Sequence, residues 1–150
     1  MIYPQDMQIY EEDLKQLFQR KERLKETGRK TDPSLAAAIF TVGSKLVKIY
    51  NEIAVTYVKL KKPKALQAAS VLLKKALALA SAKGLGRKAN ARVRRQQHVL
   101  TLNNIACLYC AKVCGGGGGG GGGVGGASRF LLSSAAFSHT PNPGTLEIRN

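Results

Sequence analysis

Three cysteines in the second half of the chain are the residues whose type and spacing could bind a metal. Cys107 and Cys110 form a CxxC pair, Cys114 follows four residues later, and His98 precedes them. A structural zinc site needs four ligands that converge as a tetrahedron, usually from a turn and a second element. These cysteines instead follow one another at i, i+3 and i+7, which is the spacing of one helical face, and the sequence has no second CxxC. We therefore expect no metal and assign the thiols to apolar packing.

Residues for catalysis are equally sparse. His98 and His139 are the two histidines, and no Asp or Glu lies between Glu52 and Glu147 to orient His98. A histidine-assisted nucleophile or a pair of carboxylates would need partners that the chain does not place together. Nine consecutive glycines, residues 115–123, lack the Lys-Ser/Thr that ends a phosphate-binding loop, and no strand leads into them. The sequence therefore predicts neither an enzyme nor a cofactor.

The elements that position these residues are indicated by a spacing that occurs twice. The two stretches are YNEIAVTY, residues 50–57, and LNNIACLY, residues 102–109. Both read large-x-x-Ile-Ala-x-x-Tyr, and on a helix these offsets fall on one stripe. The small Ala lets a neighbouring backbone approach, and the Tyr fills the next groove. Each copy is therefore predicted to lie on a helix that packs closely against another.

The first copy and the segment after it resemble a tetratricopeptide repeat. Residues 63–80 supply the second helix of such a unit, in which Ala69, Leu73 and Ala76 have the spacing Ala-x-x-x-large-x-x-Ala. Residues 101–110 are similar to the repeat helices of kinesin light chains. The resemblance implies an all-α fold built from antiparallel helical hairpins, a fragment of an α-solenoid with about one and a half units.

The spacing departs from the family in two places. Ala69 lies about three residues later than the repeat period of about 34 residues would place it, so we expect the turn KLKKPKA, residues 59–65, to be longer than usual. The two copies are also 52 residues apart. The excess lies in residues 81–97, where either the helices are extended or a long loop connects them.

Two further helices are predicted upstream of the repeat. Residues 6–27 carry apolar side chains at helical intervals and end at Gly28, with Glu11 and Lys15 spaced to form an ion pair. Thr31-Asp32-Pro33 then combines a cap residue with a proline suited to a first helical turn. A single helix is expected from about residue 33 to 61, and a fourth from about 91 to 113.

The C-terminal part differs in composition. Residues 115–150 begin with the glycine run, and glycine has the most backbone entropy to lose and no side chain to bury. We expect a helical domain over residues 1–114 and a flexible Gly-rich tail over 115–150. Because the second unit then lacks its second helix, the chain is either a domain with a linker and tail or a truncated or alternatively spliced form. The apolar face of residues 99–113, which includes Leu108, should pack against the first hairpin or mediate self-association.

Charge is distributed unevenly along the chain, whose net charge is +15. Residues 1–52 have a net charge of +1, whereas residues 53–146 contain fourteen Lys or Arg and no acid. Such a surface attracts acidic protein segments, phosphate backbones or anionic lipid, or is a solvated helix face. The candidate binding residues in its two clusters are Lys59, Lys61, Lys62, Arg92, Arg94 and Arg95. No DNA-reading motif is present, so binding to nucleic acid would be salt-dependent and show little sequence preference.

The resemblance also implies a function. In tetratricopeptide repeats the first helices line a groove, where an Asn before the Ile-Ala pair hydrogen-bonds an extended peptide. Asn104 occupies that position, and Asn51 lies one residue before the corresponding Glu52; alternatively, Asn104 is a polar residue on a solvated face. We expect a protein-interaction or scaffold module that binds a protein partner, such as an acidic peptide. The alternative is a basic protein that binds nucleic acid or an anionic surface.

Location is indicated by what the sequence lacks. The odd number of cysteines and the absence of a signal peptide argue against a secreted disulfide scaffold. The short apolar runs at residues 130–132 and 135–137 are too small to span a membrane. A cytoplasmic protein is therefore expected.

Overall fold

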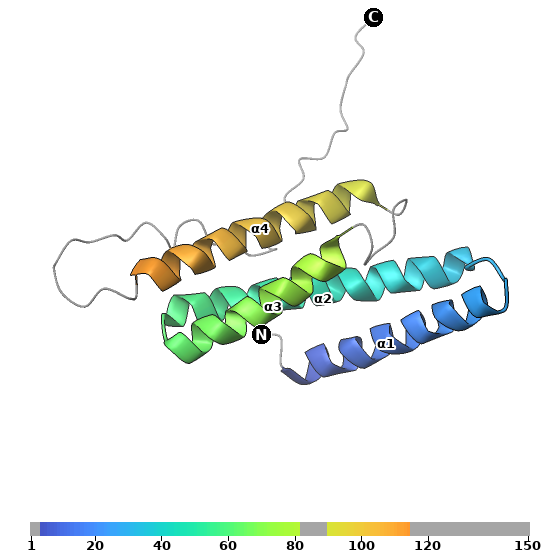
Figure 1. Cartoon of the computed structure of the whole chain (residues 1–150), viewed down its shortest axis with the longest axis horizontal. Coiled ribbons are helices and arrows are strands. Elements are labelled where there is room, and N and C mark those ends of the chain that lie inside the picture. Colours follow the sequence, from blue (N-terminus) through green and yellow to red (C-terminus); the bar gives the residue numbers. More distant parts are fainter. Residues whose placement is uncertain (1–3, 82–89, 115–150) are drawn as a thin grey trace, which may run out of the picture.

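The computed structural model describes residues 4–81 and 90–114, which form four helices and no strand (Figure 1). The prediction of an all-α fold is confirmed. The expected Gly-rich tail, residues 115–150, lies outside the described residues. The helices are α1 (Pro4–Glu26), α2 (Pro33–Leu60), α3 (Pro63–Ala80) and α4 (Ala91–Cys114).

Local signals in the sequence account for the C-terminal end of α1 and the start of α2. After α1, Gly28 adopts a left-handed backbone with φ of 68°, and its N–H donates to the carbonyl of Lys25 over 3.1 Å. Asp32 caps α2, because its side chain accepts a hydrogen bond of 3.1 Å from the N–H of Ser34. Pro33 follows at the first helical position, as the sequence predicts.

The connection between α2 and α3 is short, so the expectation of a longer turn is wrong. It consists of Lys61 and Lys62, because α2 continues to Leu60 and α3 begins at Pro63. Lys61 ends α2 in a left-handed conformation with φ of 53°, and its N–H donates to the carbonyl of Val58. The residues that exceed the repeat consensus therefore extend a helix. α4 begins at Ala91, so this helix also extends upstream of the second copy of the repeated motif, residues 102–109.

α2 is the centre of the bundle and packs against the other three helices (Figure 1). α1 and α3 run antiparallel to it, while α4 packs against both α2 and α3 and runs in the same direction as α2. Small residues permit the close approach of α2 and α3, since Ala54, Ala69 and Ala76 are completely buried. These alanines are among those that the repeated spacing and the tetratricopeptide resemblance single out.

Candidate functional site

A buried polar contact holds α4 beside α2. Asn51 of α2 donates from Nδ2 to the carbonyl of Val47 over 2.8 Å and to Oγ1 of Thr101 over 2.9 Å. Its Oδ1 accepts from Nδ2 of Asn104 over 2.9 Å. The Thr101 hydroxyl donates in turn to the carbonyl of Gln97 over 2.8 Å. Because the side chains of Asn51, Thr101 and Asn104 are buried, the bonds among them offset the desolvation of their polar groups.

The same contact brings the two copies of the repeated spacing together. Asn51 is hydrogen-bonded to Thr101 and Asn104, which lie 50 and 53 positions further along the chain. Gln97 Nε2 donates to the carbonyl of Ser44, which is also 53 positions away. These separations are close to the 52 residues between the copies. The two motifs therefore lie side by side on parallel helices, nearly in register.

The structure corrects the expected position of the two asparagines. Asn51 is completely buried and Asn104 is 1% exposed, so neither lies on a solvated face. Both face the interior between α2 and α4. A peptide would reach them only if these helices separated. Sequence reasoning missed this pairing because it depends on the packing of two segments about fifty residues apart.

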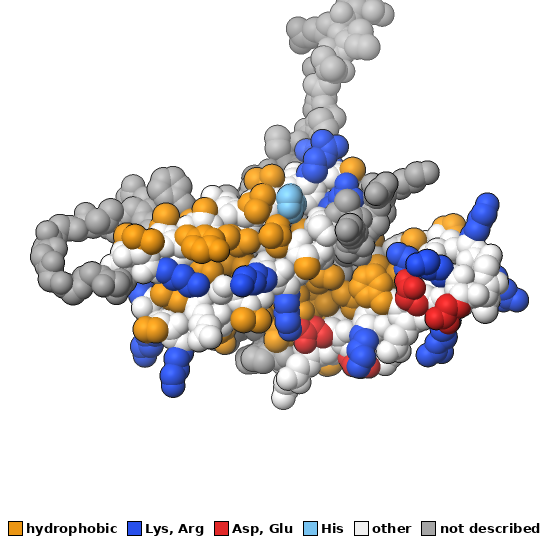
Figure 2. Space-filling model, in the orientation of Figure 1, with side chains coloured by type: hydrophobic (Ala, Val, Ile, Leu, Met, Phe, Trp, Pro, Cys, Tyr) orange, Lys and Arg blue, Asp and Glu red, His pale blue; other side chains and the backbone are white. Residues whose placement is uncertain are grey.

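α4 has one buried and one exposed apolar side. Leu100, Cys107, Leu108 and Ala111 are buried, and α4 packs against α2, so this side of residues 99–113 follows the first of the two expected alternatives, packing against the first hairpin. The other side carries Val99, Leu102, Ala106, Tyr109 and Val113, which are all exposed and which we call the α4 face. Tyr109 and Val113 are 60% and 79% exposed. Figure 2 shows hydrophobic side chains on the surface along α4.

The spacing of the α4 face is that of a helix-packing seam. Its members follow at intervals of three and four residues, as in the stripe that one helix presents to another. On α2, the residues 52 positions before Val99, Leu102 and Ala106 are Val47, Tyr50 and Ala54, and these are at most 3% exposed within the core. The counterparts of Tyr109 and Val113 are the partly buried Tyr57 and the exposed Lys61. Within residues 4–81 and 90–114, α4 presents a similar seam with no helix on it.

Basic side chains lie at both ends of the α4 face. Arg92 and Arg95 are exposed and continue the seam toward the start of α4. At the other end, the Lys112 ammonium lies 5.9 Å from the centre of the Tyr109 ring, a cation–π contact. Arg94 is half-buried and lies off the seam. The α4 face is therefore an apolar strip with positive ends.

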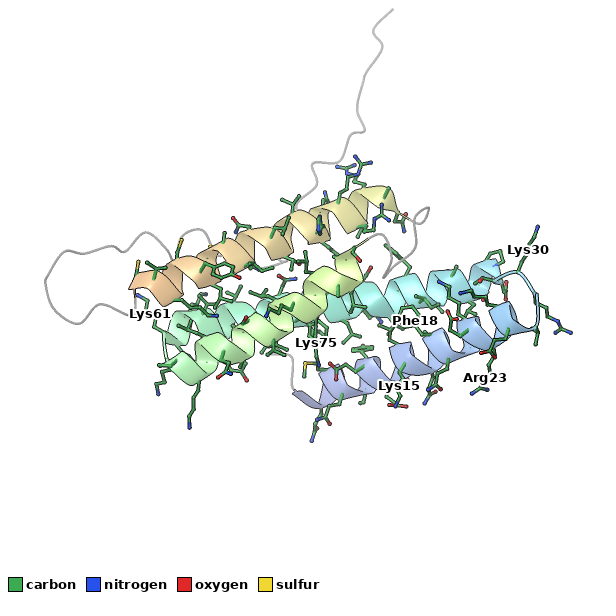
Figure 3. The ribbon with its side chains drawn as sticks, in the orientation of Figure 1. Lys15, Phe18, Arg23, Lys30, Lys61 and Lys75 are labelled. Atoms are coloured by element: carbon green, nitrogen blue, oxygen red, sulfur yellow. The ribbon has the colours of Figure 1, made fainter. Side chains whose placement is uncertain are left out.

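The six predicted basic residues do not form one patch. Lys61, labelled in Figure 3, lies with Lys59 and Lys62 where α2 meets α3. Arg92, Arg94 and Arg95 lie on the first turns of α4. Because α4 runs in the same direction as α2, the start of one helix lies far from the end of the other (Figure 1).

A hollow lies between α1 and α3, with residues of α2 in its lining. Its volume is about 740 Å³, and its apolar lining includes Leu14, Phe18, Leu46 and Leu79. Figure 3 labels Phe18 together with Lys15, Arg23 and Lys75, which also line it. No ligand chemistry is evident from this lining, since its acidic and basic side chains are mixed.

One charged contact beside this hollow differs from expectation. Glu11 accepts hydrogen bonds from the Tyr50 hydroxyl and, over 2.9 Å, from Lys75 of α3, whereas Lys15 pairs with Glu12 at 3.6 Å. The predicted Glu11–Lys15 pair is thus replaced by a contact between helices. Burial acts to raise the pKa of Glu11, but the bonds from Tyr50 and Lys75 lower it below its ordinary value. Burial, together with Glu11, raises the pKa of Tyr50.

The cysteines differ in exposure, so the expected apolar packing of the thiols holds for Cys107 and is wrong for Cys110 and Cys114. Cys107 is buried, and burial together with nearby Cys110 raises the pKa of its thiol. Cys110 and Cys114 are exposed. In the part of the chain that the structure describes, no group of three or more His, Cys, Asp or Glu is placed to hold a metal ion.

Comparisons with models of protein families, with curated proteins and with solved structures found no match. None of the helices in the described segments is both long and apolar enough to cross a bilayer.

Proposed function

We propose that the chain is a non-enzymatic protein-interaction module of tetratricopeptide-like design, and that the α4 face is its docking surface. The observation that supports this most is the exposed seam on α4. On α2 the counterparts of Val99, Leu102 and Ala106 are buried in the core between helices, so the same arrangement of Val, Ala and large side chains suits a helix on α4. The all-helical scaffold supports the same proposal, because it presents the seam on a rigid element.

The free energy gained by covering the exposed apolar side chains of the α4 face sets the affinity to expect. Full burial of a large apolar side chain contributes about 1.5–3 kcal/mol. Val99, Leu102, Tyr109 and Val113 are roughly half to four-fifths exposed, so covering them contributes about 3–8 kcal/mol. Association costs about 4–15 kcal/mol. The seam alone would therefore bind weakly, and further contacts must supply the remainder.

Selection of helical peptides displayed on phage against the full chain tests this proposal. Enriched peptides should carry apolar residues at i, i+3 and i+7, and the Leu102→Glu variant should lose their binding. Gln8→Glu is the matched control, because it adds the same carboxylate at an exposed position on α1 and should leave binding unchanged. Peptides that bind the two variants equally would contradict the proposal.

Binding to nucleic acid or an anionic surface is the second candidate, and the exposed Arg92 and Arg95 favour it. The separation of the two basic clusters weakens it, because a phosphate backbone would meet them at opposite ends of the bundle. Filter binding of RNA and DNA at several salt concentrations distinguishes the two candidates. Tight, strongly salt-dependent binding that survives Leu102→Glu would favour this second candidate.

We further propose a cytoplasmic location. The cysteines Cys107, Cys110 and Cys114 are free, and thiols persist in a reducing compartment. Measurement of the free thiols in protein isolated under conditions that trap thiol exchange would test this. A disulfide-linked form as the main species would argue for an oxidising compartment.

A further inference from the structure

The packing of α3 on α2 gives a template for what would cover the α4 face. α3 presents a seam of alternating small and large residues, in which Ala69, Leu73 and Ala76 are completely buried. Two residues connect it to α2, so it can pack on that helix only in the antiparallel direction. Since α4 runs parallel to α2 and nearly in register, a helix in the equivalent place would run antiparallel to α4.

Charge further limits the occupant. The sequence holds no Asp or Glu from residue 53 to 146, so α3 and α4 carry only basic charges. Arg92 and Arg95 lie at one end of the α4 face and Lys112 at the other, and all three are exposed. A helix with acidic flanks would find complementary charge at both ends, which favours encounter and fixes register.

The same distribution disfavours a second copy of the chain. If two α4 faces met in antiparallel fashion, Arg92 and Arg95 of one copy would lie near Lys112 of the other. Like charges would then face one another at both ends of a short seam, and each chain carries a net charge of +15. Self-association through residues 99–113 is therefore the less favoured use of this surface.

From these observations we infer that the α4 face binds an acidic amphipathic helix of another protein, antiparallel to α4, through a seam of alternating small and large apolar residues. This inference rests on the proposed function and gives the chemistry of its partner. Alanine at the seam would allow close approach of the two helices, as Ala54 and Ala69 do between α2 and α3. Asp or Glu beside the seam would pair with the basic ends.

Two synthetic peptides test the charge requirement. One has the sequence of α3, residues 63–80, and the other has the same sequence with its three lysines, Lys64, Lys74 and Lys75, replaced by Glu. Fluorescence anisotropy with the full chain should show the acidic peptide binding about tenfold or more tightly at low salt, with the difference shrinking as salt is added. Reversal of charge in Arg92→Glu/Arg95→Glu should weaken the acidic peptide and strengthen the lysine peptide.

The outcomes separate this inference from the proposed function. If both peptides bind alike and Leu102→Glu abolishes both, the docking surface stands and its preference for acidic partners is wrong. If neither peptide depends on Leu102, both proposals fail. Sedimentation of the full chain tests whether the occupant is instead a second copy of the chain. A dimer that Leu102→Glu dissociates would show that a second copy binds the α4 face.

Orientation is testable with the exposed thiols at the end of α4. Cys110 and Cys114 lie near the C-terminus of this helix, so an antiparallel acidic peptide brings its N-terminus close to them. A peptide whose N-terminal cysteine carries a thiopyridyl disulfide should exchange with Cys110 or Cys114, forming a mixed disulfide and releasing the thiopyridine, several-fold faster than one activated at a C-terminal cysteine. Equal rates, or a faster reaction from the C-terminal cysteine, would overturn the antiparallel assignment. Cys110→Ser/Cys114→Ser is the control for the site of reaction.

Discussion

Replacing Asn51 with Leu tests whether the buried amide contact determines how α2 and α4 pack. The Asn51 side chain is completely buried and bonds the Val47 carbonyl, Thr101 Oγ1 and Asn104 Nδ2. Leucine has a similar branched shape but offers no polar atom. The substitution therefore takes one bond from the Asn104 amide and one from the Thr101 hydroxyl, in a place that water does not reach.

The expected cost follows from these two groups. A buried polar group that loses its partner costs about 1–3 kcal/mol. Thr101 keeps its bond to the Gln97 carbonyl, so the Asn104 amide should account for most of the loss. We expect Asn51→Leu to lower the free energy of unfolding by about 2–3 kcal/mol, which is a large share of the roughly 5–15 kcal/mol typical of a domain.

A double variant makes the prediction specific to the contact. Asn51→Leu/Asn104→Leu removes both amides and leaves two apolar side chains together, so it should cost less than the sum of the single variants by about 1–2 kcal/mol. Urea unfolding, followed by the helical circular dichroism signal, measures the free energy of unfolding of the unchanged full chain, the two single variants and the double variant. Gln67→Leu, at an exposed position of α3, is the control and should change stability by less than about 0.5 kcal/mol. Additive single effects, or an Asn51→Leu variant as stable as the control, would refute the reasoning.

Four other substitutions give distinct outcomes. Leu108→Ala should lower the free energy of unfolding by about 2–5 kcal/mol, because Leu108 is 2% exposed in the core. Leu102→Ala on the α4 face should lower it by less than about 1 kcal/mol. Equal losses in urea unfolding would contradict the division of α4 into a buried and an exposed side. Lys61→Gly should raise stability by about 0.5–1 kcal/mol, because glycine tolerates the left-handed backbone at φ of 53°, and a lower melting temperature would count against it. Glu11→Gln should reduce the loss of stability in acid. The pKa of Glu11 is lowered from 4.5 in the folded chain, so its contribution is present above that value and is lost as the pH falls through the folded-state pKa; an unchanged acid unfolding profile would contradict this.

Much of the helical architecture was predictable because its signals act over a few residues. Asp32 and Pro33 start α2, Gly28 follows the end of α1, and Pro63 starts α3, each through bonds or backbone angles within one turn. The repeated spacing also predicted that each motif lies on a helix. The length of the turn after Leu60 was not predictable from the family pattern, because Lys61 adopts a left-handed conformation that ends α2 abruptly.

The sequence by itself thus determined the helices, their order and the charge along them. Only the tertiary structure decided which side of each helix faces which neighbour. Leu108 and Leu102 have the same chemistry and lie on one helix, yet one is in the core and the other is on the α4 face. Asn104 is buried because Asn51 lies opposite it, and Glu11 bonds Lys75, 64 residues away, in place of Lys15 on the next turn. The physical reason is that helix formation depends on neighbours within a few residues, whereas burial depends on the rotation of whole helices against one another.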